Sequence, residues 1–282
     1  MQKSFKEEKP ILYIVSTPIG NLKDITFRAI DILNGVDAIL CEDTRTSGVL
    51  LNHYQIKKPL ISYHEFNKLD QENRILNLLT EGKNLALISD AGTPGISDPG
   101  FEIIQKVIEK GYFVVSIPGP SAILAALVSS GLIIQPFTFL GFLPRKQSEM
   151  KDLLKGYVKR KETLVVYESP MRIAKTLEIL FQVLGNRKIA LSRELTKTFE
   201  TIIRTTLEDS LAMEHNTKGE YVIIIEGDHV IQTEFDETIE NHVKRYLLQG
   251  NTEKDSMKLV AKDRNISKSE VYAAIKINKQ SS

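Results

Sequence analysis

The sequence predicts an α/β protein with two α/β domains and a small C-terminal helix-turn-helix module. Three observations support this fold class. Apolar runs alternate with amphipathic helical stretches in the first part of the 282 residues, the rhythm changes near residue 131, and the part from about residue 235 is polar with helical periodicity. Alternation of strands and helices is typical of βαβ crossovers and a mostly parallel sheet. At roughly 100–200 residues per domain, the length also suggests two domains and an appendage.

The first domain, residues 1–131, is expected to contain a mostly parallel sheet. Its apolar runs predict strands at 11–16, 38–41, 60–63, 85–89 and 112–117. These runs are apolar on both faces, which indicates that helices cover both sides of the sheet. Helices are expected at 24–34, near 70–81, around 101–110 and after Ser121, and glycines at their ends suit helix termination.

The second domain, residues 132–228, has a different rhythm. Its expected strands lie at 137–142, 163–168, 188–192, 199–205 and 220–226. A helix is expected over 170–184 with Pro170 at its first position, where the missing N–H costs nothing. Residues 199–205 alternate as an antiparallel strand does, so a mixed sheet is expected.

The last part, residues 229–282, resembles a helix-turn-helix appendage. Two short helices are expected, at 252–263 and 267–276, joined by Arg264-Asn265-Ile266. The stretch lacks the β-branched runs that would predict strands.

The composition argues against several classes of protein. No stretch approaches 18 consecutive apolar residues, which argues against a membrane-spanning protein. The charged start MQKSFKEEKP is unlike a secretory signal, and a cytoplasmic protein is expected. Cys41 is the single cysteine, which rules out a disulfide scaffold, and with five scattered histidines no metal site is expected.

Basic charge is concentrated locally. The chain has 37 basic and 36 acidic residues, a net charge of +1, which argues against a surface that grips nucleic acid everywhere. Basic residues nevertheless gather in 145–161 and again in 251–282. The RNA-binding candidates are Arg145, Lys146, Lys155, Lys159, Arg160 and Lys161. The alternative for each stretch is an ordinary solvated helix face.

Small, kinked or polar residues follow every expected strand of the first domain. Ligands of open parallel sheets bind outside the carboxyl ends of the strands, so these segments predict one composite site. The segments are 16–20, 41–45, 63–65, 89–95 and 117–121. The longest loop, residues 90–100, holds three Gly and two Pro, so its backbone can approach a ligand closely, although a plain surface loop has the same composition. The dinucleotide and P-loop glycine signatures are absent.

Five blocks occur in an order that resembles a known family. They are Ser16-Thr17-Pro18-Ile19-Gly20-Asn21-Leu22, Glu42-Asp43-Thr44-Arg45, the run Ser89 to Gly100, Pro118-Gly119-Pro120-Ser121-Ala122 and Gly219-Glu220-Tyr221-Val222. Over about residues 10–228 the chain resembles the tetrapyrrole methylase superfamily, and within it the bacterial branch that methylates ribose 2′-hydroxyls of 16S rRNA. That branch usually has His-Glu-His-Asn after the third strand, where this chain has His64-Glu65-Phe66-Asn67.

The resemblance implies S-adenosylmethionine as methyl donor, bound in the cleft between the two α/β domains. Carried over position by position, the cofactor-binding residues are Pro18, Asp90, Gly92, Thr93, Gly95, Ile96, Ser121, Ala122, Tyr167, Leu191 and Tyr221. The implied substrate is a ribose of 16S rRNA in the small ribosomal subunit, cytidine 1402 of the decoding region. A homodimer is also implied.

The reaction itself suggests catalytic candidates. A protonated ribose hydroxyl is a poor nucleophile, so a nearby group should accept its proton. Candidates on the expected cleft loops are Glu42, Asp43, His64, Glu65 and Asp90, with Arg45 holding a phosphate or orienting the carboxylates. Each has a structural alternative: Asp43 as a helix N-cap, Glu42 and Arg45 as an ion pair, and His64 as a hydrogen-bonded boundary residue.

Two other functions remain open from the sequence. One is methylation of a corrin or porphyrin precursor by the same fold. The other is a non-enzymatic regulator that senses a ligand and binds DNA through the helix-turn-helix. The terminal position of that module, behind a large two-domain body, suits an accessory role better.

Overall fold

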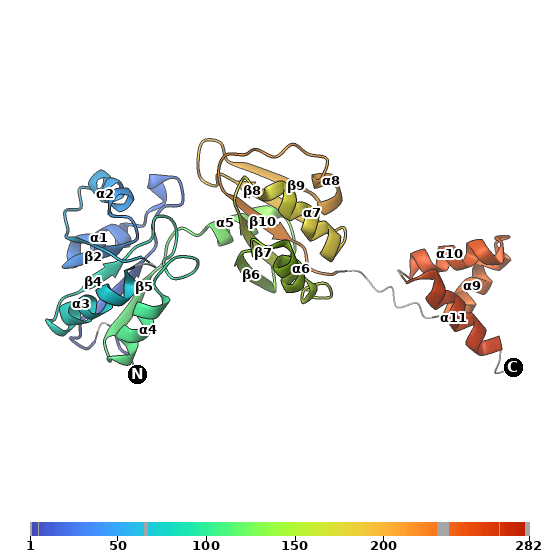
Figure 1. The fold of residues 1–282 in the computed structure, drawn as a ribbon, viewed down its shortest axis with the longest axis horizontal. Coiled ribbons are helices and arrows are strands. Elements are labelled where there is room, and N and C mark those ends of the chain that lie inside the picture. Colours follow the sequence, from blue (N-terminus) through green and yellow to red (C-terminus); the bar gives the residue numbers. More distant parts are fainter. Residues whose placement is uncertain (1, 5, 65–66, 230–236, 265, 280–282) are drawn as a thin grey trace. The chain divides into compact units, whose positions relative to one another are not determined.

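The computed structural model describes the chain except for residues 1, 5, 65–66, 230–236, 265 and 280–282 (Figure 1). It contains two compact units, Met1–Asp228 and His229–Ser282. The first unit holds two five-stranded sheets with helices on their faces, and the second is helical. This confirms the predicted fold class.

The first sheet is entirely parallel. Its strands are β1 (Ile11–Val15), β2 (Ala38–Cys41), β3 (Leu60–Ser62), β4 (Leu85–Leu87) and β5 (Phe113–Ile117), in the order β3-β2-β4-β1-β5. Each pair of neighbours is parallel, as the doubly apolar strands predict. All five carboxyl ends therefore lie at one edge.

Four helices cover this sheet on two faces. They are α1 (Phe27–Gly35), α2 (Thr44–His53), α3 (Lys68–Thr80) and α4 (Phe101–Glu109), with a short 3-10 turn η1 (Leu22–Asp24) before α1. Leu33 of α1 and Leu51 of α2 are buried in one cluster, whereas Ile75 of α3 and Ile103 of α4 are buried in another. Helices α1 and α2 cover one face of the sheet, and α3 and α4 cover the other. The part of the sheet that a ligand can reach is therefore the edge where the strands have their carboxyl ends.

The second sheet is mixed. Its strands are β6 (Phe137–Phe142), β7 (Thr163–Glu168), β8 (Lys188–Arg193), β9 (Thr201–Thr206) and β10 (Tyr221–Ile225), in the order β6-β7-β10-β8-β9. Only β6 and β7 pair in parallel; the remaining pairs are antiparallel. The carboxyl ends of β6 and β7 consequently lie beside the start of β10.

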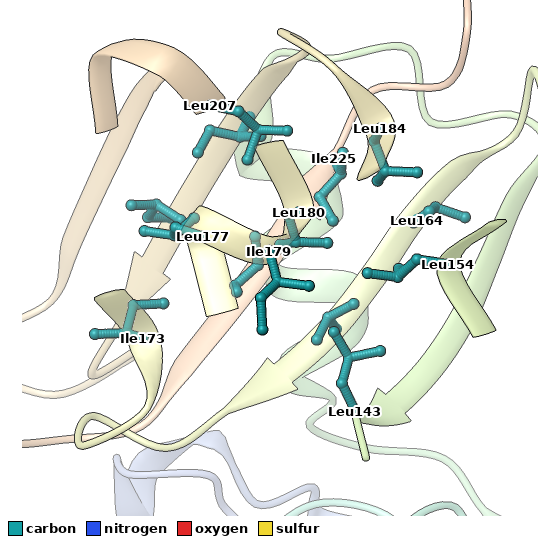
Figure 2. Packing of buried hydrophobic residues seen from close by; sticks show 14 of the residues in the cluster. Leu143, Leu154, Leu164, Ile173, Leu177, Ile179, Leu180, Leu184, Leu207 and Ile225 are labelled. Atoms are coloured by element: carbon teal, nitrogen blue, oxygen red, sulfur yellow. The ribbon is translucent and has the colours of Figure 1, made fainter. Parts of the chain in front are cut away.

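Helices also cover both faces of the second sheet. On one face lie α6 (Gln147–Lys155), α7 (Ile173–Leu184) and the short α8 (Leu207–Ser210), whose apolar side chains pack with those of the sheet in the cluster of Figure 2. On the other face, Ala126 and Leu127 of α5 (Ala122–Ser130) pack with Val165 and Val222. Although α5 precedes residue 131 in the chain, it belongs to the second sheet by its packing.

Helix α7 begins three residues later than Pro170 predicts. Pro170 lies in a turn, and the helix starts after Arg172. The Arg172 guanidinium donates to the backbone oxygens of Leu143 (3.0 Å) and Pro144 (3.2 Å). These tertiary hydrogen bonds favour the turn and are invisible in the local sequence.

The second unit contains the helices α9 (Ile239–Leu248), α10 (Glu253–Asp263) and α11 (Lys268–Lys279). Val243, Val260 and Val271, one from each helix, form its small core. Arg264, one of the basic residues of this stretch, donates from Nε to Nδ1 of the buried His242 at 3.0 Å, so it serves the packing of this unit. Among the described helices, none is both long and apolar enough to cross a bilayer.

Candidate functional site

The loop after β4 is held against the end of β1. The backbone N–H of Thr17 donates to the oxygen of Gly92 at 2.8 Å, and the N–H of Gly92 donates to the oxygen of Thr17 at 3.1 Å. Gly92 has a φ of +78°, a backbone angle that residues with a side chain rarely adopt. The two bonds form an isolated antiparallel bridge at the carboxyl edge of the parallel sheet.

Hydroxyl groups strengthen this junction. Thr17 Oγ1 donates to the backbone oxygen of Ser89 at 3.0 Å, and Ser89 Oγ donates to that of Gly92 at 3.3 Å. Ser16 Oγ and Thr93 Oγ1 lie 2.9 Å apart. Because Ser16, Thr17 and Ser89 are buried, these bonds satisfy polar groups and define the course of the loop.

The turn after β5 meets the same place. A Cβ on Gly119 would lie 2.9 Å from Cβ of Ser16, so only glycine fits there. Ser121 then caps α5, accepting from the N–H of Leu124 at 3.4 Å. This capping role is compatible with the ligand contact expected of Ser121.

A cavity of about 270 Å³ lies between these loops and the second sheet. Its volume is close to the lower end of the range for small-molecule sites. The predicted cofactor residues that line it are Asp90, Gly92, Thr93, Ile96, Ser121, Ala122, Tyr167 and Tyr221. Residues far apart in the sequence therefore meet at one cavity.

Three predicted cofactor residues do not line the cavity. Pro18 and Gly95 belong to the loops around it, and Gly95 has a φ of +80°. Leu191 is buried in the cluster beneath α7 (Figure 2 shows part of this cluster). Its side chain serves the core of the second sheet.

Several residues that line the cavity were not predicted from the sequence. They are Ile19, Ala91, Ser97, Asp98, Ile123, Phe142, Glu168, Glu194, Leu195, Lys197, Glu220 and Val222. Asp98 and Glu220 do occur inside the blocks that carry the family resemblance, so position in a block was a usable signal. Glu194 carried no such signal; it pairs with Lys197 at 2.9 Å and lies where a side chain on Gly219 would collide.

The cavity is acidic. Burial, followed by the charge of Glu42, raises the pKa of Asp98 to about 6, and the charges of Asp90 and Glu220 act in the same direction. Burial, followed by the charge of Asp98, raises the pKa of Tyr167 to about 12. Such a cavity favours a cationic ligand, which would relieve the repulsion between its carboxylates.

Among the catalytic candidates, Asp90 lines the cavity, whereas Glu42, Asp43, Arg45 and His64 lie at the same edge outside its lining. Burial raises the pKa of Glu42, with a further contribution from the charge of Asp90 and an opposing one from His64. Burial also raises the pKa of Asp90. Because Glu42 also raises the pKa of Asp98, these carboxylates form one electrostatic group. Glu65, a further candidate, lies outside the described residues, as does Phe66.

Asp43 and Arg45 pair with each other. Asp43 is the N-cap of α2, accepting from the backbone N–H of Arg45 at 2.8 Å, and Arg45 Nη2 contacts Asp43 Oδ2 at 2.8 Å. These hydrogen bonds lower the pKa of Asp43 to about 2. The expected ion pair of Arg45 therefore forms with Asp43 and not with Glu42, while the Arg45 side chain remains 91% exposed.

His64 donates its backbone N–H to Asn67 Oδ1 at 2.8 Å.

The six basic candidates fall into two groups at opposite ends of α6. Arg145 and Lys146 follow β6, at the end where Phe142 and Tyr167 line the cavity. The second group consists of Lys155, Lys159, Arg160 and Lys161. Lys155 is the last residue of α6, and the other three precede β7, at the end of β7 opposite the cavity. From the lengths of α6 and β7, the groups are roughly 14–17 Å apart. All six side chains are exposed.

Comparison with known proteins now identifies the family. The model of the Tetrapyrrole (Corrin/Porphyrin) Methylases matches residues 11–210. The chain belongs to this family. The resemblance seen in the sequence is thereby confirmed, and the match covers the first sheet and the second sheet as far as α8, with β10 beyond it.

Curated relatives share most of the chain. It is 46% identical to "Ribosomal RNA small subunit methyltransferase I" of Bacillus subtilis (strain 168), covering 98% of both chains. It is 49% identical to the protein of the same name from Haemophilus influenzae over 77% of this chain and 78% of that one. The first of these alignments also spans the helical second unit.

Solved structures share the fold at low sequence identity. Diphthine synthase matches with a TM-score of 0.62 and 16% identity, covering 77% of this chain and 90% of that chain. Cobalt precorrin-4 methyltransferase matches with a TM-score of 0.56 and 19% identity, covering 77% and 94%. Both comparisons concern the methylase fold alone.

The donor set suits the cofactor of the family. S-adenosylmethionine carries a positive sulfonium and a positive amino group against a single carboxylate. The cavity offers Asp90, Asp98 and Glu220 as counter-charges and the backbone of Thr93 for hydrogen bonding. Its apolar lining residues, such as Ile96 and Ala122, suit the uncharged parts of the molecule.

Proposed function

We propose that this protein methylates a ribose 2′-hydroxyl of 16S rRNA in the small ribosomal subunit. It is a methyltransferase of the tetrapyrrole methylase family, and its methyl donor is S-adenosylmethionine. The observation that carries the proposal is an acidic cavity with exposed cations, Arg145 and Lys146, beside it, in a chain closely similar to rRNA methyltransferases. Cytidine 1402 is the proposed target nucleotide.

The residues proposed to hold the methyl donor are among those that line the acidic cavity. Thr93 offers backbone groups, and Asp98 and Glu220 offer negative charge. Ser121 and Tyr167, which are far apart in the sequence, both offer hydroxyl groups to the cavity. When bound, S-adenosylmethionine supplies an activated methyl group on a sulfonium sulfur. The task of the protein is then to align the acceptor oxygen and to accept its proton.

Glu42 is the proposed proton acceptor. A carboxylate whose pKa is raised is a stronger base, and burial together with Asp90 raises the pKa of Glu42. Asp43 is engaged as a helix cap and by Arg45, so it is proposed to position α2 and the exposed Arg45 guanidinium near an RNA phosphate. His64 is proposed to orient Glu42, whose pKa its charge lowers.

The decisive experiment maps the methyl group. Labelled S-adenosylmethionine is incubated with the protein and with small subunits from a strain that lacks the corresponding enzyme, and the labelled nucleotide is identified. Label in a ribose of 16S rRNA supports the proposal. A parallel incubation holds a corrin or porphyrin precursor in place of the subunits, and label only there supports the alternative substrate class. No transfer to RNA rejects the proposal.

Glu42 is tested separately from cofactor binding. Glu42→Gln should lower kcat by about 10²–10⁴-fold, the usual contribution of general base catalysis, with an unchanged Kd for S-adenosylmethionine. The matched control is Asp31→Asn on the exposed side of α1, which should leave both constants unchanged. Loss of cofactor affinity with unchanged kcat in Glu42→Gln contradicts this role.

A homodimer in the cytoplasm is the proposed working form. The small subunit is the expected partner, by analogy with the named relatives. Sedimentation equilibrium of the full chain measures the assembly directly, and a monomer at working concentrations rejects the dimer.

A further inference from the structure

A second, more open hollow adjoins the cavity. Phe142 and Glu168 line both, so the two spaces share a wall. The other residues around this hollow are Leu143, Pro144, Arg145, Ser169, Met171 and Arg172. It lies at the carboxyl ends of β6 and β7, on the side of the cavity formed by the second sheet.

The floor of this hollow is built from buried, paired groups. Glu168 is 1% exposed; it accepts from Thr176 Oγ1 at 2.6 Å and from the N–H of Ser169 at 2.7 Å. Its carboxylate also lies 3.4 Å from Arg172 Nη2. Arg172 in turn binds the backbone oxygens of Leu143 and Pro144, so the turn that carries Arg145 is tied to β7.

Leu143 anchors that turn from below. Its side chain is buried in the cluster with Leu154 and Leu164 (Figure 2). The backbone that carries Phe142 and Pro144 is therefore fixed twice, by the hydrogen bonds from Arg172 and by the buried side chain of Leu143. A preorganised surface of this kind loses little entropy when it binds.

The exposed side chains of the hollow combine apolar and cationic chemistry. Phe142 is 57% exposed and Met171 79% exposed, although both are large apolar residues. Arg145 is exposed, and in the part of the chain that the structure describes it has no ion-pair partner, whereas Lys146 pairs with Glu149 at 3.0 Å. The ring of Phe142 is also supported by Tyr167, with centroids 5.6 Å apart at 61°.

We propose that this hollow binds the acceptor nucleotide of the RNA, with its base stacked on Phe142 and Met171 and a neighbouring phosphate on Arg145. Single-stranded RNA is recognised by stacking of unpaired bases on aromatic side chains and by cations along the backbone. The adjoining cavity is acidic and repels phosphate, so the free cation on the other side of Phe142 sets the direction of approach.

The inference rests on the proposed function and adds its substrate subsite. The acceptor ribose lies between its base and its phosphate, so docking both on Phe142 and Arg145 places the ribose at the wall shared with the cavity. Arg172 and Glu168 act as positioning residues, because they hold the turn that carries Arg145.

The test uses the full chain with unmethylated small ribosomal subunits. Phe142→Ala and Met171→Ala should each lower kcat/KM for the subunits, Phe142→Ala by about 5- to 100-fold, the usual effect of losing one stacking partner. The Kd for S-adenosylmethionine of Met171→Ala should stay within about twofold of the wild type. Phe142→Tyr keeps the ring and should restore most of the activity.

Two controls separate stacking from other effects. Phe27→Ala removes an aromatic side chain that is 90% exposed in α1, and it should leave kcat/KM unchanged. The affinity for RNA, measured by fluorescence anisotropy at several salt concentrations, should fall in Phe142→Ala with an unchanged salt dependence. In Arg145→Gln the salt dependence itself should become weaker.

The outcomes distinguish this inference from the proposed function. If the wild type methylates the subunits while Phe142→Ala and Met171→Ala do so at wild-type kcat/KM, the stacking subsite is rejected and the proposed function stands. If the wild type transfers no methyl group to RNA, the proposed function fails and the subsite fails with it. Reduced kcat/KM in both variants, with rescue by Phe142→Tyr, supports the subsite.

Discussion

Thr17 and Gly92 exchange two backbone hydrogen bonds, of 2.8 and 3.1 Å, that join the end of β1 to the loop after β4. This bridge sets the height of the loop above the sheet, and Gly92 lines the cavity at that level. The loop therefore presents its backbone to a ligand from a fixed position, which is the property that its glycines and prolines were expected to provide.

Gly92→Ala should weaken cofactor binding because the residue has a φ of +78°. An added Cβ meets Ile19 Cγ2 at 3.5 Å, an ordinary contact, so the cost is backbone strain of about 1–2 kcal/mol. The control is Gly82→Ala, with a φ of +83°, open space around it and a place outside the cavity. Both variants should lose similar stability in urea unfolding, and only Gly92→Ala should raise the Kd for S-adenosylmethionine. Equal Kd values would refute this role of the loop.

Asp98→Asn should stabilise the free protein and weaken its binding of the methyl donor. The folded-state pKa of about 6 exceeds the ordinary 3.8, so the ionised form is disfavoured in the fold. The stability linked to this group is complete below about pH 4 and is lost as the pH rises through about 6. At pH 7 the variant should gain about 1–3 kcal/mol in unfolding free energy. Calorimetry at pH 4 and pH 7 checks this, and an equal gain at both values would contradict it.

The affinity for S-adenosylmethionine should depend on pH through the same carboxyl. Below about pH 6, Asp98 takes up a proton and the cavity loses negative charge, so the affinity for a cation should fall. Above that pH the affinity should level off. Isothermal titration calorimetry from pH 5 to 8 measures the profile, and Asp98→Asn should flatten it. A profile unchanged in the variant would assign the titration to another group.

The two basic groups should respond differently to RNA length. Arg145→Gln with Lys146→Gln should weaken binding of both short RNA and whole subunits, since these residues lie at the cavity end of α6. Lys159→Gln with Lys161→Gln should weaken binding of whole subunits alone, because an RNA of a few nucleotides does not span roughly 14–17 Å from the cavity end. Lys57→Gln with Lys110→Gln is the control outside both groups. Equal losses in all three pairs would mean that the basic charge acts without a defined location.

Truncation after Asp228 should leave the methylase fold intact. The unit Met1–Asp228 contains its own apolar clusters on both sheets, and the helical unit has a separate small core. The truncated chain should unfold cooperatively and bind S-adenosylmethionine with an unchanged Kd. Measuring kcat/KM for subunits then reports what the helical unit adds to RNA recognition. Aggregation or loss of cofactor binding would show that the two units depend on each other.

Local sequence patterns predicted several strands with their bounds. The strands at 38–41, 137–142 and 163–168 begin and end where the sequence predicts, because each is a largely apolar run with turn residues beside it. The start of α7 was predicted three residues early, because Arg172 is held in the turn by backbone oxygens of Leu143 and Pro144. No local pattern contains that contact.

The sequence by itself determined the family, the two α/β sheets and the loops that surround the cavity, because apolar periodicity and Gly-Pro blocks are local properties of a chain. The tertiary structure decided which charges meet. Asp98 and Glu42 lie on different loops yet interact electrostatically, and Phe142 at the end of β6 and Met171 after β7 line the same hollow. Electrostatic and stacking partners depend on distance in space, which strand order and crossovers set, and the spacing of residues along the chain does not record it.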